Sequence, residues 1–273
     1  MHGAVDRHYS HVKKLGTRAE LSRADQSPYR NMSILILFDN KLGSCLIMSV
    51  LIFMKRSREE NKSKTKPKGK RDLNKEKTKE KILAAALELF RRNGLDGTTT
   101  KQISKKAGIA EGTLFNYFKT KEDLALFFFQ KETHDLVRWY GKETRLQRAP
   151  LPEKLFAIIH RQLEYIAPYE EFIGAVFFRS LQLHSKLSPL SLESQELRLK
   201  YLRFVREVLA QAEEKQEIPR IGELGAYAVG LFYIGIVMHW LHDTSRGKQK
   251  TLALLDRSLS LATGVLKKGA WDW

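Results

Sequence analysis

The chain has 273 residues, of which 42% are hydrophobic and 29% are charged, a composition typical of a globular protein and not of a disordered one. Its single cysteine, Cys45, excludes an internal disulfide framework and any metal site built from several cysteines. The net charge is +17, and residues 55–81 alone carry 13 basic and 5 acidic side chains. Such a local excess favours a polyanionic partner, because neutralised phosphates release counterions. A solvated linker with no partner would have the same composition.

Residues 1–54 differ from the rest of the chain. Residues 32–54 are apolar but interrupted by Asp39–Lys41, and the uninterrupted stretch 42–54 has 13 residues, which is short of the ~20 that a spanning helix requires. Three interpretations stay open: a marginal membrane anchor, a poorly ordered extension, or a segment that is not native. We favour the third, with Met54 as the true start, because a basic segment follows it directly.

Residues 55–77 are charged, contain Pro and Gly, and have almost no apolar side chains. We therefore expect a basic, disordered arm that becomes ordered only on a ligand.

From Thr78 the pattern becomes helical. The apolar residues of the first segment recur at a spacing that places them on one face of a helix. They are Ile82, Leu83, Ala86, Leu87 and Phe90. Gly94 stands where this helix is expected to stop.

Two short helices are predicted next. Thr99 and Gln102 have the spacing of a capping box, which predicts a helix over about Thr100–Ala107. Gly108 permits a tight turn with positive φ, and a further helix is expected from about Glu111 to Phe118. Two short helices joined by a Gly-containing turn are typical of a helix-turn-helix, whose second helix lies in the major groove of DNA.

If Leu114 and Phe118 face inward, the other side of this second helix is available to DNA. Asn116 is suited to adenine, and Lys121, at the start of the next helix, is suited to phosphate. The expected DNA-contacting residues are Thr99, Thr100, Lys101, Gln102, Glu111, Gly112, Thr113, Phe115, Asn116, Tyr117 and Lys121.

Residues 125–273 show helical apolar periods separated by Pro and Gly, with no convincing strand pattern, and about six longer helices are expected. Leu224–Leu241 has 18 residues without a formal charge, so its helix must be buried. A membrane-spanning helix is the alternative by length, but three glycines and His239 disfavour it. With Leu252–Leu266 this helix is expected to form a dimer interface. The residues expected there are Ala226, Gly230, Tyr233, Leu255 and Leu259.

The same region supplies candidates for a largely apolar ligand pocket, although ordinary core packing is the alternative for each of them. They are Phe128, Trp139, His160, Tyr165, Phe178, His184 and Tyr201.

No nucleotide-binding glycine loop, HExxH motif or nucleophile elbow is found. His239 and His242 are spaced to face one metal ion, but a third ligand is not apparent. We therefore expect no enzyme activity, no metal and no cofactor.

The segment Thr78–Leu124 resembles the DNA-binding domain of the TetR (tetracycline-repressor-like) family. The resemblance rests on "KILAAALELF", "NG", "TTTKQISKKAGIAEGTLFNYF" and "KTKEDL". Two positions depart from the family pattern: Ala110 stands where a Ser cap is usual, and Phe115 stands where Tyr is frequent.

The resemblance implies an all-α protein in two parts: a three-helix helix-turn-helix domain over residues 78–124, followed by a larger ligand-binding and dimerisation domain over residues 125–273. It also implies a cytoplasmic homodimer that binds double-stranded operator DNA and represses transcription until an apolar or aromatic small molecule releases it. The alternative is a DNA-bound protein-interaction factor with the same fold and no small-molecule effector. A membrane is not an expected partner.

Overall fold

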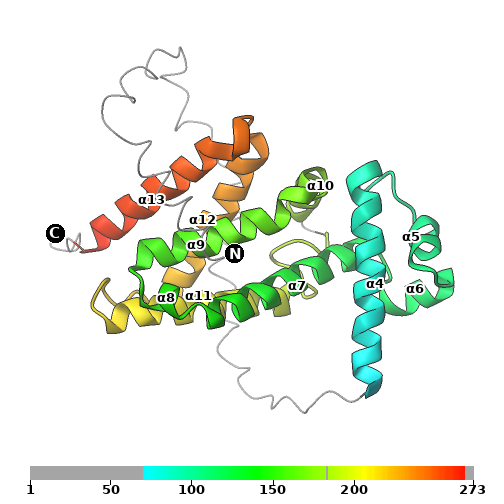
Figure 1. Cartoon of the computed structure of the whole chain (residues 1–273), viewed down its shortest axis with the longest axis horizontal. Coiled ribbons are helices and arrows are strands. Elements are labelled where there is room, and N and C mark those ends of the chain that lie inside the picture. Colours follow the sequence, from blue (N-terminus) through cyan, green and yellow to red (C-terminus); the bar gives the residue numbers. More distant parts are fainter. Residues whose placement is uncertain (1–69, 183, 268–273) are drawn as a thin grey trace. The chain divides into compact units, whose positions relative to one another are not determined.

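The computed structural model describes residues 70–182 and 184–267, which form helices and connecting loops without a β-strand (Figure 1). The α-helices are α4 (Lys70–Asn93), α5 (Thr100–Ala107), α6 (Glu111–Tyr117), α7 (Lys121–Lys142), α8 (Thr144–Arg148), α9 (Leu151–Ile166), α10 (Glu170–Ser180), α11 (Gln195–Glu214), α12 (Gly222–His242) and α13 (Gln249–Lys267), with 3₁₀ turns at Ala167–Tyr169 and Arg246–Lys248. The predicted all-α fold class is confirmed. Cys45, the extension 1–54 and residues 55–69 of the predicted arm lie outside the described residues.

The first helix begins earlier than the sequence indicated. Residues 70–77, assigned to a disordered arm, form the first two turns of α4, so for these residues the prediction was wrong. Their Lys and Glu residues are good helix formers, and Thr78 donates through its hydroxyl to the carbonyl of Asn74. Further along α4, the predicted apolar face is buried, and Ile82, Ala86 and Phe90 are completely inaccessible to solvent.

Local sequence signals set the helix boundaries of the DNA-binding region. Gly94 follows α4 with a φ of 69°, and its N–H donates to the carbonyl of Phe90. Both hydrogen bonds of the capping box between Thr99 and Gln102 are present at the start of α5. Gly108 ends α5 in the left-handed region, with a φ of 63°. These features place α5 and α6 against each other (Figure 1).

The larger domain is built around α9, which packs against α7, α11 and α13. Its apolar residues, including Leu155, Ile159 and Leu163, are buried, each contributing roughly 1.5–3 kcal/mol by leaving water. Between residue 118 and the last described residue, 267, the structure has seven α-helices where about six were expected, because the short helix α8 precedes Pro150.

Helix α12 is the apolar segment singled out in the sequence. Among the described residues it is the one helix long and apolar enough to cross a bilayer. It packs against α11 and α13 within the protomer, yet Leu224, Leu231 and Met238 stay exposed. One side of α12 is therefore buried within the protomer, and the expected burial of its other side against a partner subunit stays a prediction.

Candidate functional site

Helix α6 presents a short polar surface. Leu114 and Phe118 point into the domain and are 1% and 3% exposed, whereas Phe115 and Asn116 on the other side are open to solvent. No neighbouring group lies within 4 Å of the position that a Cβ would take on Gly112. Packing inside the protomer therefore does not require glycine there, and the backbone of α6 is accessible to a ligand.

The N-terminus of α6 is held without the usual cap. Ala110 provides no side-chain hydrogen bond. Instead Glu111, in the first turn, accepts a hydrogen bond from the Thr100 hydroxyl at 2.8 Å, which ties α6 to the start of α5. A carboxylate in the first turn also interacts favourably with the helix dipole.

The polar residues at the start of α5 are partly used inside the protein. The Thr99 hydroxyl accepts from the Gln102 backbone N–H, and the Gln102 side chain accepts from the Thr99 N–H. The Thr99 hydroxyl keeps its own hydrogen for an external acceptor. Lys101, Thr113 and Tyr117 remain exposed or half-buried around the same surface.

Lys121 binds backbone carbonyl groups of the protein itself. Its ammonium donates to the carbonyl oxygens of Leu95, Thr98 and Asp96, at 2.6, 3.1 and 3.4 Å. These hydrogen bonds bind Lys121 to the loop between α4 and α5. Its contact with phosphate stays a prediction.

Several contacts connect the DNA-binding region to the larger domain, and three of them involve α10 or the segment after it. The ring of Phe90 in α4 stacks on that of Phe172 in α10, with centroids 5.0 Å apart. Arg179 of α10 forms an ion pair with Asp96, in the loop between α4 and α5. Lys186 pairs with Asp123 of α7 at 2.7 Å.

The carboxyl of Asp123 is held ionised by that ion pair. Partial burial alone would raise its pKa, but hydrogen bonds from Lys186 and Thr120 lower the pKa below its usual range. The neighbouring Glu122 accepts from the Ser185 hydroxyl and from the Lys186 N–H. Both acidic residues at the start of α7 therefore bind the segment that follows α10.

Of the seven residues predicted to line one ligand pocket, Phe128 and Tyr165 are in contact, and the set as a whole does not line a common pocket. Phe128 is fully buried in an aromatic cluster with Tyr165 and Phe172. Trp139 lies beside the guanidinium of Arg161, and His160 stacks on Phe156. The remaining members are dispersed: Phe178 and His184 are exposed, whereas Tyr201 is half-buried.

A buried acid, which the sequence analysis did not identify, lies in the larger domain. Glu132 of α7 is 4% exposed and accepts from the Thr133 hydroxyl at 3.3 Å. Gln162 of α9 also forms a hydrogen bond with the carboxyl of Glu132. The Tyr201 hydroxyl of α11 in turn donates to Oε1 of Gln162 at 3.4 Å. Burial raises the pKa of Glu132 to about 7, although the bonds from Gln162 and Thr133 lower it. In the sequence, the helical period of α7 marks Glu132 only as a polar residue on an apolar face of the helix.

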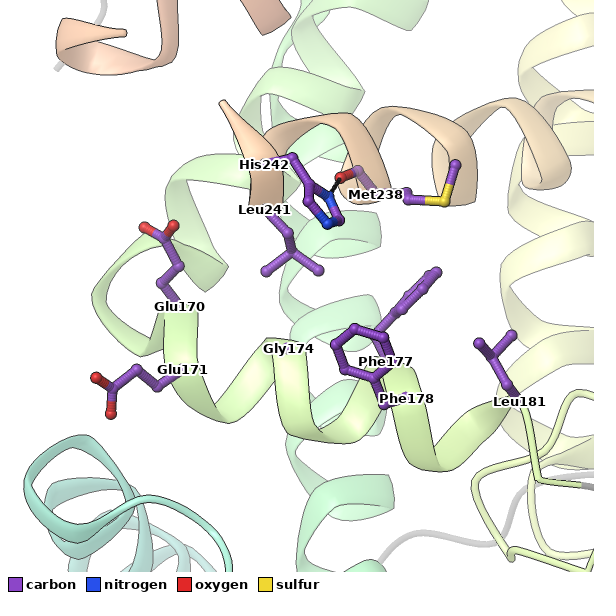
Figure 2. Close-up of a pocket in the computed structure, with 9 residues that line it drawn as sticks. All are labelled: Glu170, Glu171, Gly174, Phe177, Phe178, Leu181, Met238, Leu241 and His242. Atoms are coloured by element: carbon purple, nitrogen blue, oxygen red, sulfur yellow. Dashed lines mark hydrogen bonds between the residues drawn. The ribbon is translucent and has the colours of Figure 1, made fainter. Parts of the chain in front are cut away.

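An open pocket of about 720 Å³ lies between α10 and α12 (Figure 2). Its wall is mainly apolar, with Phe177, Leu181 and Leu241 facing the opening, while the carboxylates of Glu170 and Glu171 stand at one end. Phe178 is the one predicted ligand-binding residue in this wall. Lys248 pairs with Glu170 at 2.6 Å and offsets part of the negative charge.

The residues predicted for the dimer interface are mostly internal. Ala226, Leu255 and Leu259 are buried within the protomer, and their place in a dimer interface stays a prediction. Gly230 and Tyr233 are half-buried. Helices α12 and α13 each have a buried and an exposed apolar side, and the sequence does not say which one packs internally. The large apolar side chains left exposed on these helices are Leu224, Leu231, Ile234, Met238, Leu254, Leu261 and Val265.

The histidine pair considered as a metal site has other partners. The Nδ1 atom of His239 lies 2.9 Å from the Thr251 hydroxyl, and Nδ1 of His242 lies 2.8 Å from the carbonyl oxygen of Met238. Within the described residues, no group of three or more His, Cys, Asp or Glu side chains is arranged to hold a metal ion.

Solved structures share this fold. The FadR transcriptional regulator of Bacillus subtilis, solved in complex with stearoyl-CoA, is 22% identical, with 70% of this chain and 98% of that chain covered and a TM-score of 0.53. Thermus thermophilus FadR, a TetR-family repressor in complex with lauroyl-CoA, is also 22% identical, with 67% and 93% covered and a TM-score of 0.52.

Sequence comparisons give the family. Residues 82–126 match the model of bacterial regulatory proteins of the tetR family, and residues 154–273 match that of the tetracyclin repressor-like C-terminal domain. The Fatty acid metabolism regulator protein of Bacillus subtilis is 26% identical over 137 residues, half of this chain and 69% of that protein. The HTH-type transcriptional regulator QacR of Staphylococcus aureus is 50% identical over 116 residues, 41% of this chain and 62% of that protein. The chain therefore belongs to the TetR family and is a DNA-binding transcriptional regulator.

Proposed function

We propose that this regulator is a repressor that a small, largely apolar molecule releases from its operator by binding between α10 and α12. The observation that carries this proposal is the double role of α10. One side of the helix lines the pocket with Gly174 and Phe177, while Phe172 and Arg179 contact the DNA-binding region. A ligand that favours a different position of α10 would thereby change how α5 and α6 are held. It shifts the equilibrium only by its difference in affinity for the two states.

The relatives suggest an effector class. One named relative is a fatty acid metabolism regulator, and two proteins with the same fold were solved with stearoyl-CoA and lauroyl-CoA. The volume of about 720 Å³ and the apolar wall suit an acyl chain. Because Glu170 and Glu171 stand at one end, we expect the phosphates of a CoA ester to lie away from them, outside the pocket.

DNA reading would require two copies of the chain. The exposed residues Leu224, Leu231 and Met238 recur every seven positions on α12, as do Leu254 and Leu261 on α13, which places them on one side of each helix. We propose that these sides meet in a homodimer, formed in the cytoplasm. Its two α6 helices would read half-sites about one helical turn, ~34 Å, apart. The accessible surface around Gly112 and Asn116 supports this role for α6.

The effector proposal is tested with the DNA upstream of the protein's own gene as probe. Binding is followed by fluorescence anisotropy while lauroyl-CoA, stearoyl-CoA or CoA alone is added. We expect the acyl esters, and not CoA, to release the DNA. A Gly174→Leu variant, which fills the pocket, should bind the same DNA and stay bound when the ester is added.

The matched control is Gly141→Leu, on α7, where no neighbouring group lies within 4 Å of an added Cβ. This variant should respond like the wild type. An equal response of both variants would place the effector elsewhere. The second candidate, a DNA-bound interaction factor without an effector, predicts that no acyl ester raises the melting temperature, whereas a ligand specific to the folded state must raise it.

A further inference from the structure

Three basic side chains meet on the surface of α7 and α11. Nε2 of His134 lies 2.7 Å from Nη2 of Arg138, one turn further along α7, and Nδ1 of His134 lies 3.5 Å from Nζ of Lys200 on α11. His134 and Arg138 are exposed and Lys200 is half-buried, so a ligand can reach all three. These side chains belong neither to the DNA-reading surface nor to the wall of the pocket between α10 and α12.

The cluster brings more hydrogen-bond donors together than acceptors. A neutral imidazole has one acceptor nitrogen and one N–H donor, so the ring of His134 can accept from Arg138 or from Lys200, but not from both. At the other nitrogen, a ring N–H faces a second donor. A protonated imidazole has donors at both nitrogens. An oxyanion beside the ring would accept from the ring N–H and from the neighbouring cation together, and would remove this mismatch.

The positive charge of the cluster is only partly compensated. The carboxylate of Asp135 pairs with Lys131 at 3.2 Å and lies 3.9 Å from the guanidinium of Arg138. Lys200 has no ion-pair partner among the described residues. Partial burial lowers the pKa of His134, and so do the positive charges of Lys200 and Arg138. Lys131 acts in the same direction and Asp135 in the opposite one. The ring therefore lies in a field that repels a proton and attracts an anion.

We propose that His134, Arg138 and Lys200 form a binding site for a phosphate group. A guanidinium binds two phosphate oxygens through its fork, and an ammonium binds as a point charge. The inference rests on the proposed function for one source of the phosphate, because a CoA ester whose acyl chain lies between α10 and α12 keeps its phosphates outside that pocket. Free phosphate is a second source with the same chemistry. DNA is disfavoured, since His134 lies about 20 Å along α7 from Lys121 at the start of the helix.

Isothermal titration calorimetry of the full chain tests the site, with CoA and sodium phosphate as separate probes. Lys200→Gln removes one cation from the cluster, and the matched control Lys250→Gln removes one from the exposed surface of α13. We expect the control to bind CoA like the wild type. Lys200→Gln should bind it about tenfold to a hundredfold more weakly, as expected for the loss of one hydrogen bond from a charged group. Equal affinities of the two variants would overturn the proposal.

A second readout follows the ring of His134 by NMR, with its signal assigned from the spectrum of His134→Gln. A bound phosphate should raise the pKa of His134, because a nearby negative charge favours the imidazolium. A pKa that neither probe moves would overturn the proposal. A rise with CoA at lower concentrations than with sodium phosphate would support the site with the ester head group as its ligand. A rise with sodium phosphate alone would support the site with free phosphate as its ligand.

The phosphate site and the proposed effector can fail separately. If CoA or phosphate raises the pKa of His134 but no acyl ester releases the DNA, the effector proposal is wrong and the site stands. If lauroyl-CoA releases DNA from Lys200→Gln and from the wild type at the same concentration, and the pKa of His134 does not respond, the effector stands and the site is wrong. Without effector, Lys200→Gln should bind the DNA like the wild type. Weaker binding would mean that the cluster contacts DNA, and would overturn the proposal.

Discussion

The DNA-reading region and the larger domain fix their important residues in different ways. In the first, helix ends are set by neighbours in sequence: Thr99 with Gln102 at the start of α5, and Gly108 at its end. In the second, each notable feature joins distant segments, as Glu132 joins Gln162 and as the pocket joins α10 to α12. Local rules can be read from one sequence, whereas long-range packing cannot. The two regions should therefore respond differently to substitution.

The strongest test of this separation is the contact where the regions meet. Phe90 is completely buried and stacks on Phe172, so Phe90→Ala should lower the free energy of unfolding by about 3–5 kcal/mol. Urea denaturation measures this change. Phe178→Ala is the control, because this ring is 63% exposed and its loss should cost less than ~0.5 kcal/mol. Similar losses in both variants would mean that Phe90 does not connect the regions as described.

The next effect belongs to the larger domain alone. Glu132 has a folded-state pKa of about 7, raised from 4.5 by burial, so the folded protein holds this proton more tightly than the unfolded chain does. Its stability is therefore complete below pH 4.5 and falls as pH rises to about 7. At pH 8 the loss is roughly 3 kcal/mol, since each unit of pKa difference is about 1.4 kcal/mol.

Glu132→Gln removes this titration and should be more stable than the wild type at pH 8, by up to that amount. The advantage should shrink toward zero at pH 4.5. Thermal denaturation at several pH values gives the difference, with Glu207→Gln, on the exposed side of α11, as the control. An advantage that does not depend on pH would show that Glu132 is not the titrating group.

The same contrast explains what the sequence predicted. The helix-turn-helix, its capping box and the inward positions of Leu114 and Phe118 follow from spacing over a few residues, and the structure has them. The hydrogen bonds of Lys121 could not be predicted, because its acceptors lie more than twenty positions earlier in the chain. The burial of Leu255 and Leu259 inside the protomer could not be predicted, because periodicity finds apolar sides without telling which neighbour covers them.

The smallest expected effect tests whether neighbours in sequence alone set the start of α5. Thr99→Ala removes the hydroxyl that accepts from the Gln102 N–H at 3.2 Å, which should cost about 1 kcal/mol of stability. The Gln102 side chain can still accept from the backbone N–H of residue 99, so only half of the capping box is lost.

Thr120→Ala is the matched comparison, because Thr120 and Asp123 form the corresponding box at the start of α7. If caps act locally, hydrogen exchange should quicken over α5 in the first variant and over the first turn of α7 in the second. Faster exchange throughout both domains in either variant would mean that the reading helices depend on the whole fold, and the contrast between the two regions would no longer hold.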